Sequence, residues 1–272
     1  MTDPREKNFP LPAPLLGSVA LEPNRWKKDS ERVPSLLLSQ LAGEAQKAGF
    51  AGWEIWERHY LLADEAEQSA LRESFFPVIG WNSYYCPGYT PAEEAESIQK
   101  AIHELGSRLN FIKFNLGPKG TPFIEQVEAA LTWADKLPNH VRLYCECHGG
   151  TILEDPDGAA RAFSLWPEEK FSAIIHPLTP DVDTLKKWFE TLGGRIVHLH
   201  LQGRDQNRKV AAASTLADAY QQAWEVLRKN HFSGTASIEF VAGLNQPGES
   251  PASLFAQACA DVTWLRENQF VC

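Results

Sequence analysis

Short apolar runs typical of β-strands alternate with longer segments of helical periodicity along almost the whole chain. The runs predict eight strands, at residues 16–21, 52–56, 77–81, 111–115, 142–148, 172–176, 196–201 and 236–241. Between them, apolar residues recur every three or four positions opposite polar ones, as they do in helices that lie on a sheet. Because a helical connection between neighbouring strands makes those strands parallel, the alternation predicts an α/β fold with a parallel sheet.

The number of strand–helix units favours a closed barrel over an open sheet. Eight units of about 30 residues match the roughly 250 residues of a (β/α)₈ barrel, and the chain has 272 residues. An open nucleotide-binding sheet would carry a glycine-rich first turn, but the first turn here reads LEPNRW, without a GxGxxG or GxxxxGK sequence. We therefore predict a single-domain (β/α)₈ TIM barrel over residues 1–272, with an N-terminal extension of about residues 1–14.

The composition limits which molecules the protein can be expected to bind and where in the cell it can be expected to lie. The formal net charge is -9 and the basic residues are scattered, which disfavours nucleic-acid binding. No apolar stretch reaches the roughly 18 residues that cross a membrane, and the N-terminus lacks the basic-then-apolar order of a secretory signal. The five cysteines have no disulfide-framework spacing. We expect a cytoplasmic protein without a membrane segment, and the sequence leaves open whether it forms a homodimer or a higher oligomer.

Four ionisable residues stand near the ends of the last four predicted strands. They are Glu146, His176, His200 and Glu239, in YCECHGG, AIIHPL, VHLHLQG and SIEFVAG. Such groups are costly at the end of a buried strand unless they converge, and parallel strands end at one rim. One divalent metal ion would neutralise both carboxylates and use both imidazoles as ligands. The sequence therefore predicts a metal site, with a purely structural hydrogen-bond and ion-pair network as the alternative.

Strand alternation decides between neighbouring candidates. His200 is nearer the strand end than His198, which we expect to support it from below. Cys145, Cys147 and His148 could form a zinc cluster, but alternation directs both thiols toward the helices, away from the imidazole. Packing is therefore the preferred interpretation of the two cysteines.

Five further residues are candidate substrate contacts. Glu54 and Lys113 face the barrel interior by the same alternation, with an ion pair between them as the alternative. Trp81 offers a stacking face for a sugar ring, although a barrel core uses tryptophan equally well. The predicted substrate-binding residues are Glu54, Lys113, His148, Trp81 and Arg204.

The order of these motifs resembles a known family. A glutamate ends the fifth strand, a ligand ends the sixth, HLHLQGRD forms the seventh and IEF the eighth, as in the xylose-isomerase-like barrels called sugar phosphate isomerases/epimerases. The resemblance covers most of the chain. It implies one divalent ion held by Glu, Asp, His and Glu, with the glutamates also transferring protons. Glu146, His200 and Glu239 match this set, whereas His176 stands where Asp is usual, which favours Mn²⁺, Zn²⁺ or Co²⁺ over Mg²⁺.

The resemblance and the metal site together predict an enzyme of carbohydrate metabolism. We expect a metal-dependent isomerase or epimerase that acts on a sugar, keto-sugar or polyol. Its reaction would pass through a metal-stabilised enediolate, with Glu146 and Glu239 as the catalytic acid and base. The alternative is a lyase, dehydratase or hydrolase that acts on a keto-sugar or cyclitol at the same site. A phosphodiesterase like the apurinic endonucleases is disfavoured because the third and fourth strands end without histidine, and a non-catalytic barrel is the remaining alternative.

Overall fold

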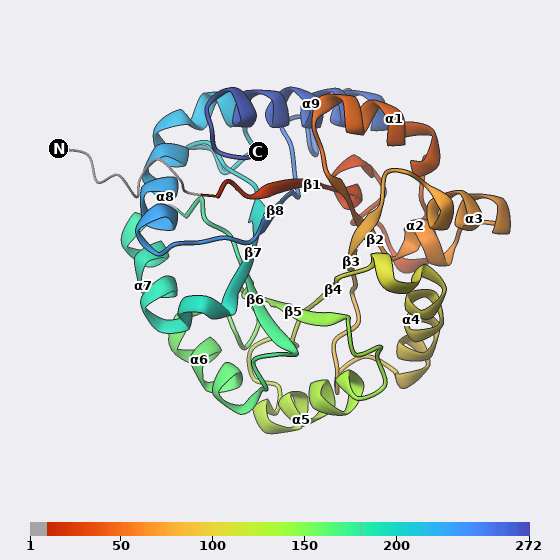
Figure 1. Cartoon of the computed structure of the whole chain (residues 1–272), viewed down its shortest axis with the longest axis vertical. Helices are drawn as coiled ribbons and strands as arrows, with labels where there is room; N and C mark the ends of the chain where they lie inside the picture. The colour runs from red at the N-terminus through yellow and green to blue at the C-terminus, as the bar shows by residue number, and fades with distance from the viewer. Residues whose placement is uncertain (1–9, 180) are drawn as a thin grey trace.

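Eight parallel strands close into a barrel that is surrounded by helices, as Figure 1 shows in a view along the barrel. This computed structural model describes residues 10–179 and 181–272. Each strand pairs with the next along the chain, and pairing of β1 with β8 closes the barrel. The strands are β1 Ala13–Gly17, β2 Gly52–Trp56, β3 Val78–Asn82, β4 Phe111–Phe114, β5 Arg142–Glu146, β6 Phe171–Ile175, β7 Ile196–Leu201 and β8 Thr235–Ile238. The predicted (β/α)₈ barrel is confirmed.

The first strand is the clearest error in the predicted boundaries. It begins at Ala13, inside the predicted N-terminal extension, whose residues 1–9 lie outside the described part of the chain. The predicted strand at 16–21 continues as a 3₁₀ turn, η2 (Ser18–Leu21), which packs against the last helix. The turn is fully buried, so its apolar character comes from tertiary packing and not from strand pairing.

The helices form the outer layer. They are α1 Leu38–Ala48, α2 Arg58–Leu61, α3 Glu65–Glu73, α4 Ala92–Leu105, α5 Phe123–Ala134, α6 Pro156–Leu165, α7 Val182–Leu192, α8 Ala217–Lys229 and α9 Pro251–Glu267. Several begin where a side chain accepts a hydrogen bond from a first-turn N–H, as Asp64, Asp155 and Ser250 do. No helix among the described residues combines the length and the apolar character needed to cross a bilayer.

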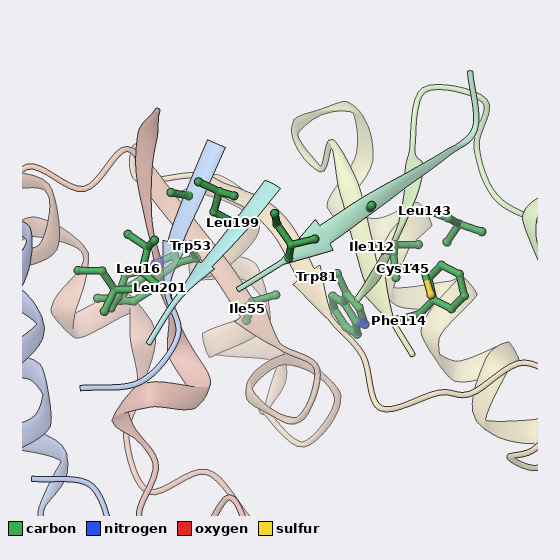
Figure 2. Close-up of a cluster of buried hydrophobic side chains, with 14 of the residues drawn as sticks. Leu16, Trp53, Ile55, Trp81, Ile112, Phe114, Leu143, Cys145, Leu199 and Leu201 are labelled. Carbon is green, nitrogen blue, oxygen red and sulfur yellow. The ribbon is translucent and has the colours of Figure 1, made fainter. Parts of the chain in front are cut away.

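Every second strand residue points away from the barrel axis into a core between strands and helices. Figure 2 shows this cluster, in which Trp53 and Ile55 come from one strand and Ile112 and Phe114 from another. All four are fully buried. Successive side chains of a strand point to opposite faces, so one half of them packs in this core and the other half points into the barrel interior.

The lower part of the interior is filled by aromatic rings. Phe111 stacks on Tyr144 with ring centroids 4.4 Å apart and lies 4.9 Å from the ring of His198. Above this layer, toward the carboxyl ends of the strands, the interior side chains become polar. The fold thus places a layer of packed aromatic rings under the rim where the predicted site lies.

Candidate active site

The four predicted metal ligands meet at the carboxyl rim of the barrel. Glu146 is the last residue of β5, His200 lies near the end of β7, and His176 and Glu239 directly follow β6 and β8. One nitrogen or oxygen atom from each of the four lies within 4.8 Å of the others. The structure therefore brings together residues that are separated by up to 93 positions in the sequence (239 minus 146).

His200 lies between the two carboxylates. Its Nδ1 is 3.2 Å from Glu146 Oε1 and 3.2 Å from Glu239 Oε1. His176 approaches the same oxygen of Glu146 through Nε2 at 2.9 Å, and its Nδ1 lies 3.7 Å from Glu239 Oε2. Two carboxylates and two imidazoles around one point are a donor set that suits a divalent transition metal.

A second layer of side chains fixes His200 from below. Glu54 is 1% exposed, and its Oε1 lies 3.1 Å from His200 Nε2 while its Oε2 lies 3.2 Å from His198 Nε2. His198 also contacts the hydroxyls of Thr235 and Ser237. The predicted support of His200 by His198 is therefore indirect and runs through Glu54.

This placement corrects two interpretations of Glu54. Its carboxylate lies beneath the imidazoles and does not line the cavity above them, so the predicted substrate contact is wrong. The alternative, an ion pair with Lys113, is also wrong, because that ammonium binds Glu146 Oε2 at 2.8 Å. A carboxylate that accepts a hydrogen bond from a metal-ligating histidine orients the ring and makes it a better ligand.

Glu146 is saturated with donors. Lys113 Nζ and Asn115 Nδ2 contact its Oε2 at 2.8 and 3.0 Å, and the two imidazoles contact Oε1. Burial alone would raise the pKa of Glu146, but the Lys113 ammonium and the imidazole contacts outweigh burial and hold the pKa well below its ordinary value. Burial would lower the pKa of Lys113, yet the adjacent Glu146 raises it. Both groups are therefore charged.

The charges of the cluster provide a test of whether an ion fits. Three carboxylates, of Glu54, Glu146 and Glu239, meet the ammonium of Lys113, which leaves two negative charges before any proton on His200 is counted. Burial opposes a charge on His200, but the three surrounding carboxylates raise its pKa well above the ordinary value. The cluster thus attracts positive charge at the point where the four side chains converge, and a divalent cation would balance the excess.

A cavity of about 500 Å³ opens above the cluster, a volume typical of small-molecule sites. Glu146 and Glu239 are among the residues that line it. His148 and Arg204, two of the predicted substrate contacts, are exposed at its wall. The polar and aromatic residues of the wall include Trp26, Asn82, Tyr84, Lys113, Asn115, His148, Gln202, Arg204 and Phe240.

Trp81 is not part of this wall. Its ring is fully buried, lies edge-on against Tyr60 of α2, and belongs to the outer core in Figure 2. The neighbouring Asn82 has the inward parity and lines the cavity. The prediction that Trp81 contacts substrate is wrong, because its side chain points outward, toward the helices.

Sequence reasoning missed several residues of the cavity, and Gln202, Trp26 and Phe240 show why. Gln202 lies two positions beyond His200, just after the end of β7, and its side chain therefore points to the same side, into the cavity. This spacing can be seen in the sequence. Trp26 and Phe240 lie in the loops after β1 and β8, with ring centroids 5.6 Å apart. They belong to loop segments without regular periodicity, so only the tertiary structure shows that they lie together.

Comparison with known proteins identifies the fold. No protein-family model and no curated protein sequence matches the chain. Among solved structures, the chain is similar to apo 3-keto-D-glucoside 4-epimerase from E. coli, with a TM-score of 0.64, 14% sequence identity and coverage of 94% of this chain and 99% of that one.

Two further structures extend the likeness. A probable 3-DHS dehydratase of petrobactin synthesis from Bacillus anthracis has a TM-score of 0.63 and 14% identity, and the match covers 92% of this chain and 97% of that chain. A xylose isomerase-like TIM barrel protein from Mycobacterium smegmatis in complex with magnesium has a TM-score of 0.56 and 8% identity, with coverage of 98% and 99%. The chain thus has the fold of the xylose isomerase-like TIM barrels, as the resemblance in its sequence predicts.

Proposed function

We propose that this protein is a metal-dependent isomerase or epimerase that acts on a sugar, keto-sugar or polyol. One observation carries the proposal: four ligand groups from four successive strands converge under an open cavity at the carboxyl rim of the barrel, where TIM-barrel enzymes place their chemistry. The similarity of the fold to an epimerase and to a probable dehydratase supports an enzyme of this kind.

Glu146, His176, His200 and Glu239 would hold the ion. Two imidazoles among four ligands favour Mn²⁺, Zn²⁺ or Co²⁺, with Mg²⁺ as an alternative that the magnesium complex from Mycobacterium smegmatis supports. Such an ion would polarise a substrate carbonyl and so acidify the hydrogen on the neighbouring carbon.

The two glutamates have different surroundings, and this difference assigns their roles. Glu146 accepts contacts from four donors and is held ionised, so it is a poor proton acceptor. Glu239 lines the cavity, and at its Oε2 it accepts one hydrogen bond, from Gln202 at 2.8 Å. We therefore assign the proton abstraction to Glu239, which would also return that proton to the substrate, and an electrostatic role to Glu146, whose ionised carboxylate carries no proton to donate.

The substrate would lie between the two glutamates and the opposite wall. Lys113, His148 and Arg204 offer donors to hydroxyl groups there, in agreement with a small carbohydrate. Nothing in the charge of the chain favours a nucleic acid in its place.

The first test is replacement of Glu239 by Gln. We expect Glu239→Gln to reduce kcat by roughly 10²- to 10⁴-fold, because the amide cannot accept the substrate proton. The assay follows exchange of substrate hydrogen with solvent in D₂O by NMR, over a panel of ketoses, 3-keto-glucosides and cyclitols, before and after treatment with a chelator. The exposed Glu44→Gln variant of α1 is the matched control.

Each outcome of this assay has a defined meaning. Metal-dependent exchange that disappears in Glu239→Gln supports the proposal, and undiminished exchange after thorough chelation contradicts it. Release of water without epimerised product would instead identify the metal-dependent lyase or dehydratase. Metal analysis of both proteins shows whether the variant lost the ion or only the base.

A further inference from the structure

Gln202 links two of the proposed metal ligands. It follows β7, is half-buried and lines the cavity. Its Nε2 lies 2.8 Å from Glu239 Oε2 and 3.0 Å from His176 Nδ1. One amide nitrogen thus contacts a carboxylate and an imidazole at the same time.

The contact with Glu239 fixes the orientation of the amide. An ionised carboxylate accepts hydrogen bonds and donates none, so Gln202 must direct its NH₂ group toward Glu239. The second hydrogen of the same group then points to His176 Nδ1, which must accept it. The proton of the neutral imidazole therefore lies on Nε2, from where it donates to Glu146 Oε1 at 2.9 Å.

This tautomer is the wrong one for binding an ion at the position that the geometry favours. His176 Nε2 shares the oxygen Glu146 Oε1 with His200 Nδ1, at 2.9 and 3.2 Å, whereas His176 Nδ1 is directed at Gln202. A ligating Nε2 must lose its proton, which moves to Nδ1, and Nδ1–H then needs an acceptor. A bound ion would neutralise the Glu239 carboxylate, which then no longer requires the amide donor, and Gln202 could turn its amide over and present Oε1 to Nδ1–H.

We propose that Gln202 is a positioning residue that sets the tautomer of His176: its NH₂ group holds the Nε2–H form, and its carbonyl oxygen holds the Nδ1–H form when a divalent ion binds. The inference rests on the proposed metal site and adds a residue that controls how that site accepts its ion. It also explains how His176 could act as a metal ligand at a position where the xylose-isomerase-like barrels usually have Asp, since a ligating imidazole needs a partner that orients it.

The test measures the tautomer directly. In protein labelled with ¹⁵N-histidine, two-bond ¹H–¹⁵N correlations distinguish the two forms, and a His176→Gln spectrum assigns the signal. In wild-type protein we expect the Nε2–H form without metal and the Nδ1–H form after addition of Zn²⁺, which is diamagnetic. An Nδ1–H form in the metal-free wild type overturns the proposal.

Two variants give opposite expectations. Gln202→Leu leaves Nδ1–H without an acceptor, so we expect Zn²⁺ affinity about 10- to 100-fold weaker by chelator competition. Gln202→Glu can accept from Nδ1–H but cannot donate, so we expect the Nδ1–H form even without metal, and tighter Zn²⁺ binding than in Gln202→Leu. The exposed Gln206→Leu variant in the same loop is the matched control.

The outcomes separate this inference from the proposed function. The same tautomer in wild type and in both Gln202 variants, or equal Zn²⁺ affinity in the two variants, overturns the role of Gln202. Failure of Zn²⁺, Mn²⁺, Co²⁺ and Mg²⁺ to bind the wild type overturns the proposed function, while the metal-free tautomer still decides whether Gln202 orients His176.

Discussion

At the scale of single residues, His200 shows how much the surroundings contribute to a candidate metal ligand. It is fully buried, with two carboxylates at Nδ1 and Glu54 at Nε2. Because Glu54 occupies Nε2, Nδ1 would be the ligand atom in the proposed metal site, on the side where Glu146 and Glu239 lie. Glu54 therefore belongs to the site although it does not line the cavity.

Replacement of Glu54 by Gln tests this role. We expect Glu54→Gln to weaken the affinity for the divalent ion by roughly 10- to 100-fold, because a neutral amide orients His200 less firmly and makes it a weaker ligand. Competition with a coloured chelator measures the affinity, and metal content per chain shows whether a site remains. Unchanged affinity, with Glu44→Gln as the control, would show that Glu54 only fills space.

The sequence predicted most of these residues individually. Strand ends and alternation pointed to the four candidate ligands, Lys113 and His148, and the position after the seventh strand pointed to Arg204; the structure places all of them at the rim or in the cavity wall. Trp81 was proposed only because its ring could stack on a sugar, and the alternative, a place in the barrel core, is the one that the structure shows. Gln202 was missed because the alternation was not followed beyond the end of the strand.

At the scale of elements, the inner face of β3 is shaped around a neighbouring ring. A Cβ atom at Gly80 would lie 2.7 Å from Phe111 Cε2 of β4. The ring of Phe111 is held against Tyr144 and His198, so it has little freedom to move aside. Glycine at this position therefore allows an aromatic layer to form beneath the polar rim.

Replacement of Gly80 by Ala should accordingly destabilise the fold. We expect a loss of about 1–3 kcal/mol in the free energy of unfolding, because the added methyl group overpacks the barrel interior. Urea denaturation measures the change. Gly43→Ala in α1 is the matched control: nothing lies within 4 Å of its Cβ position, so better helix propensity should stabilise that variant by about 0.5–1 kcal/mol. Equal effects of the two substitutions would contradict this account.

Element boundaries were predicted unevenly for a physical reason. The bounds of β2 and β7 match the prediction, since apolar alternation there coincides with strand pairing. For the first strand, burial continues beyond the last paired residue into the turn η2, which packs under α9. Hydrophobicity reports burial, and only hydrogen bonding between strands defines where a strand ends.

At the scale of the whole molecule, the last helix anchors the loop that follows β7. Asp261 of α9 is 5% exposed and accepts hydrogen bonds from Ala213 N, in η6 (Ala213–Leu216), and from Gln257 Nε2, both at 2.9 Å. Burial raises the pKa of Asp261 from 3.8 to about 6, against the effect of the two donors. The carboxylate is thus a cost to the folded state whenever it is charged.

The sign of this effect gives a pH-dependent prediction. Because the pKa of Asp261 is higher in the folded state, the folded protein binds more protons between pH 4 and 6, and stability falls as the pH rises through this range. Asp261→Asn keeps both hydrogen bonds and removes the charge. We expect the variant to be more stable than wild type by about 1–3 kcal/mol at pH 8, with little difference at pH 4.

Urea denaturation at both pH values measures this difference. The exposed Asp218→Asn variant of α8 is the control, and its effect should stay within about 0.5 kcal/mol at either pH. A stability difference for Asp261→Asn that does not change between pH 4 and pH 8 would contradict the assigned cost of the buried charge.

The sequence by itself determined the architecture and which ionisable residues meet at the rim. Eight repeats of one period leave few folds other than a closed parallel barrel, and in such a barrel all strands end at the same rim. Charged residues at those ends must therefore meet, whatever the details of packing. This conclusion needs only the alternation of strands and helices along the sequence and the common direction of parallel strands.

Only the tertiary structure decided the layers within the barrel. Alternation shows that Glu54, Lys113 and His198 point inward, but the height of each side chain depends on how the strands tilt and stagger as the barrel closes. That stagger places Glu54 under His200 and brings Lys113 to Glu146. Strand stagger results from the packing of the whole chain and has no counterpart in any local segment of the sequence.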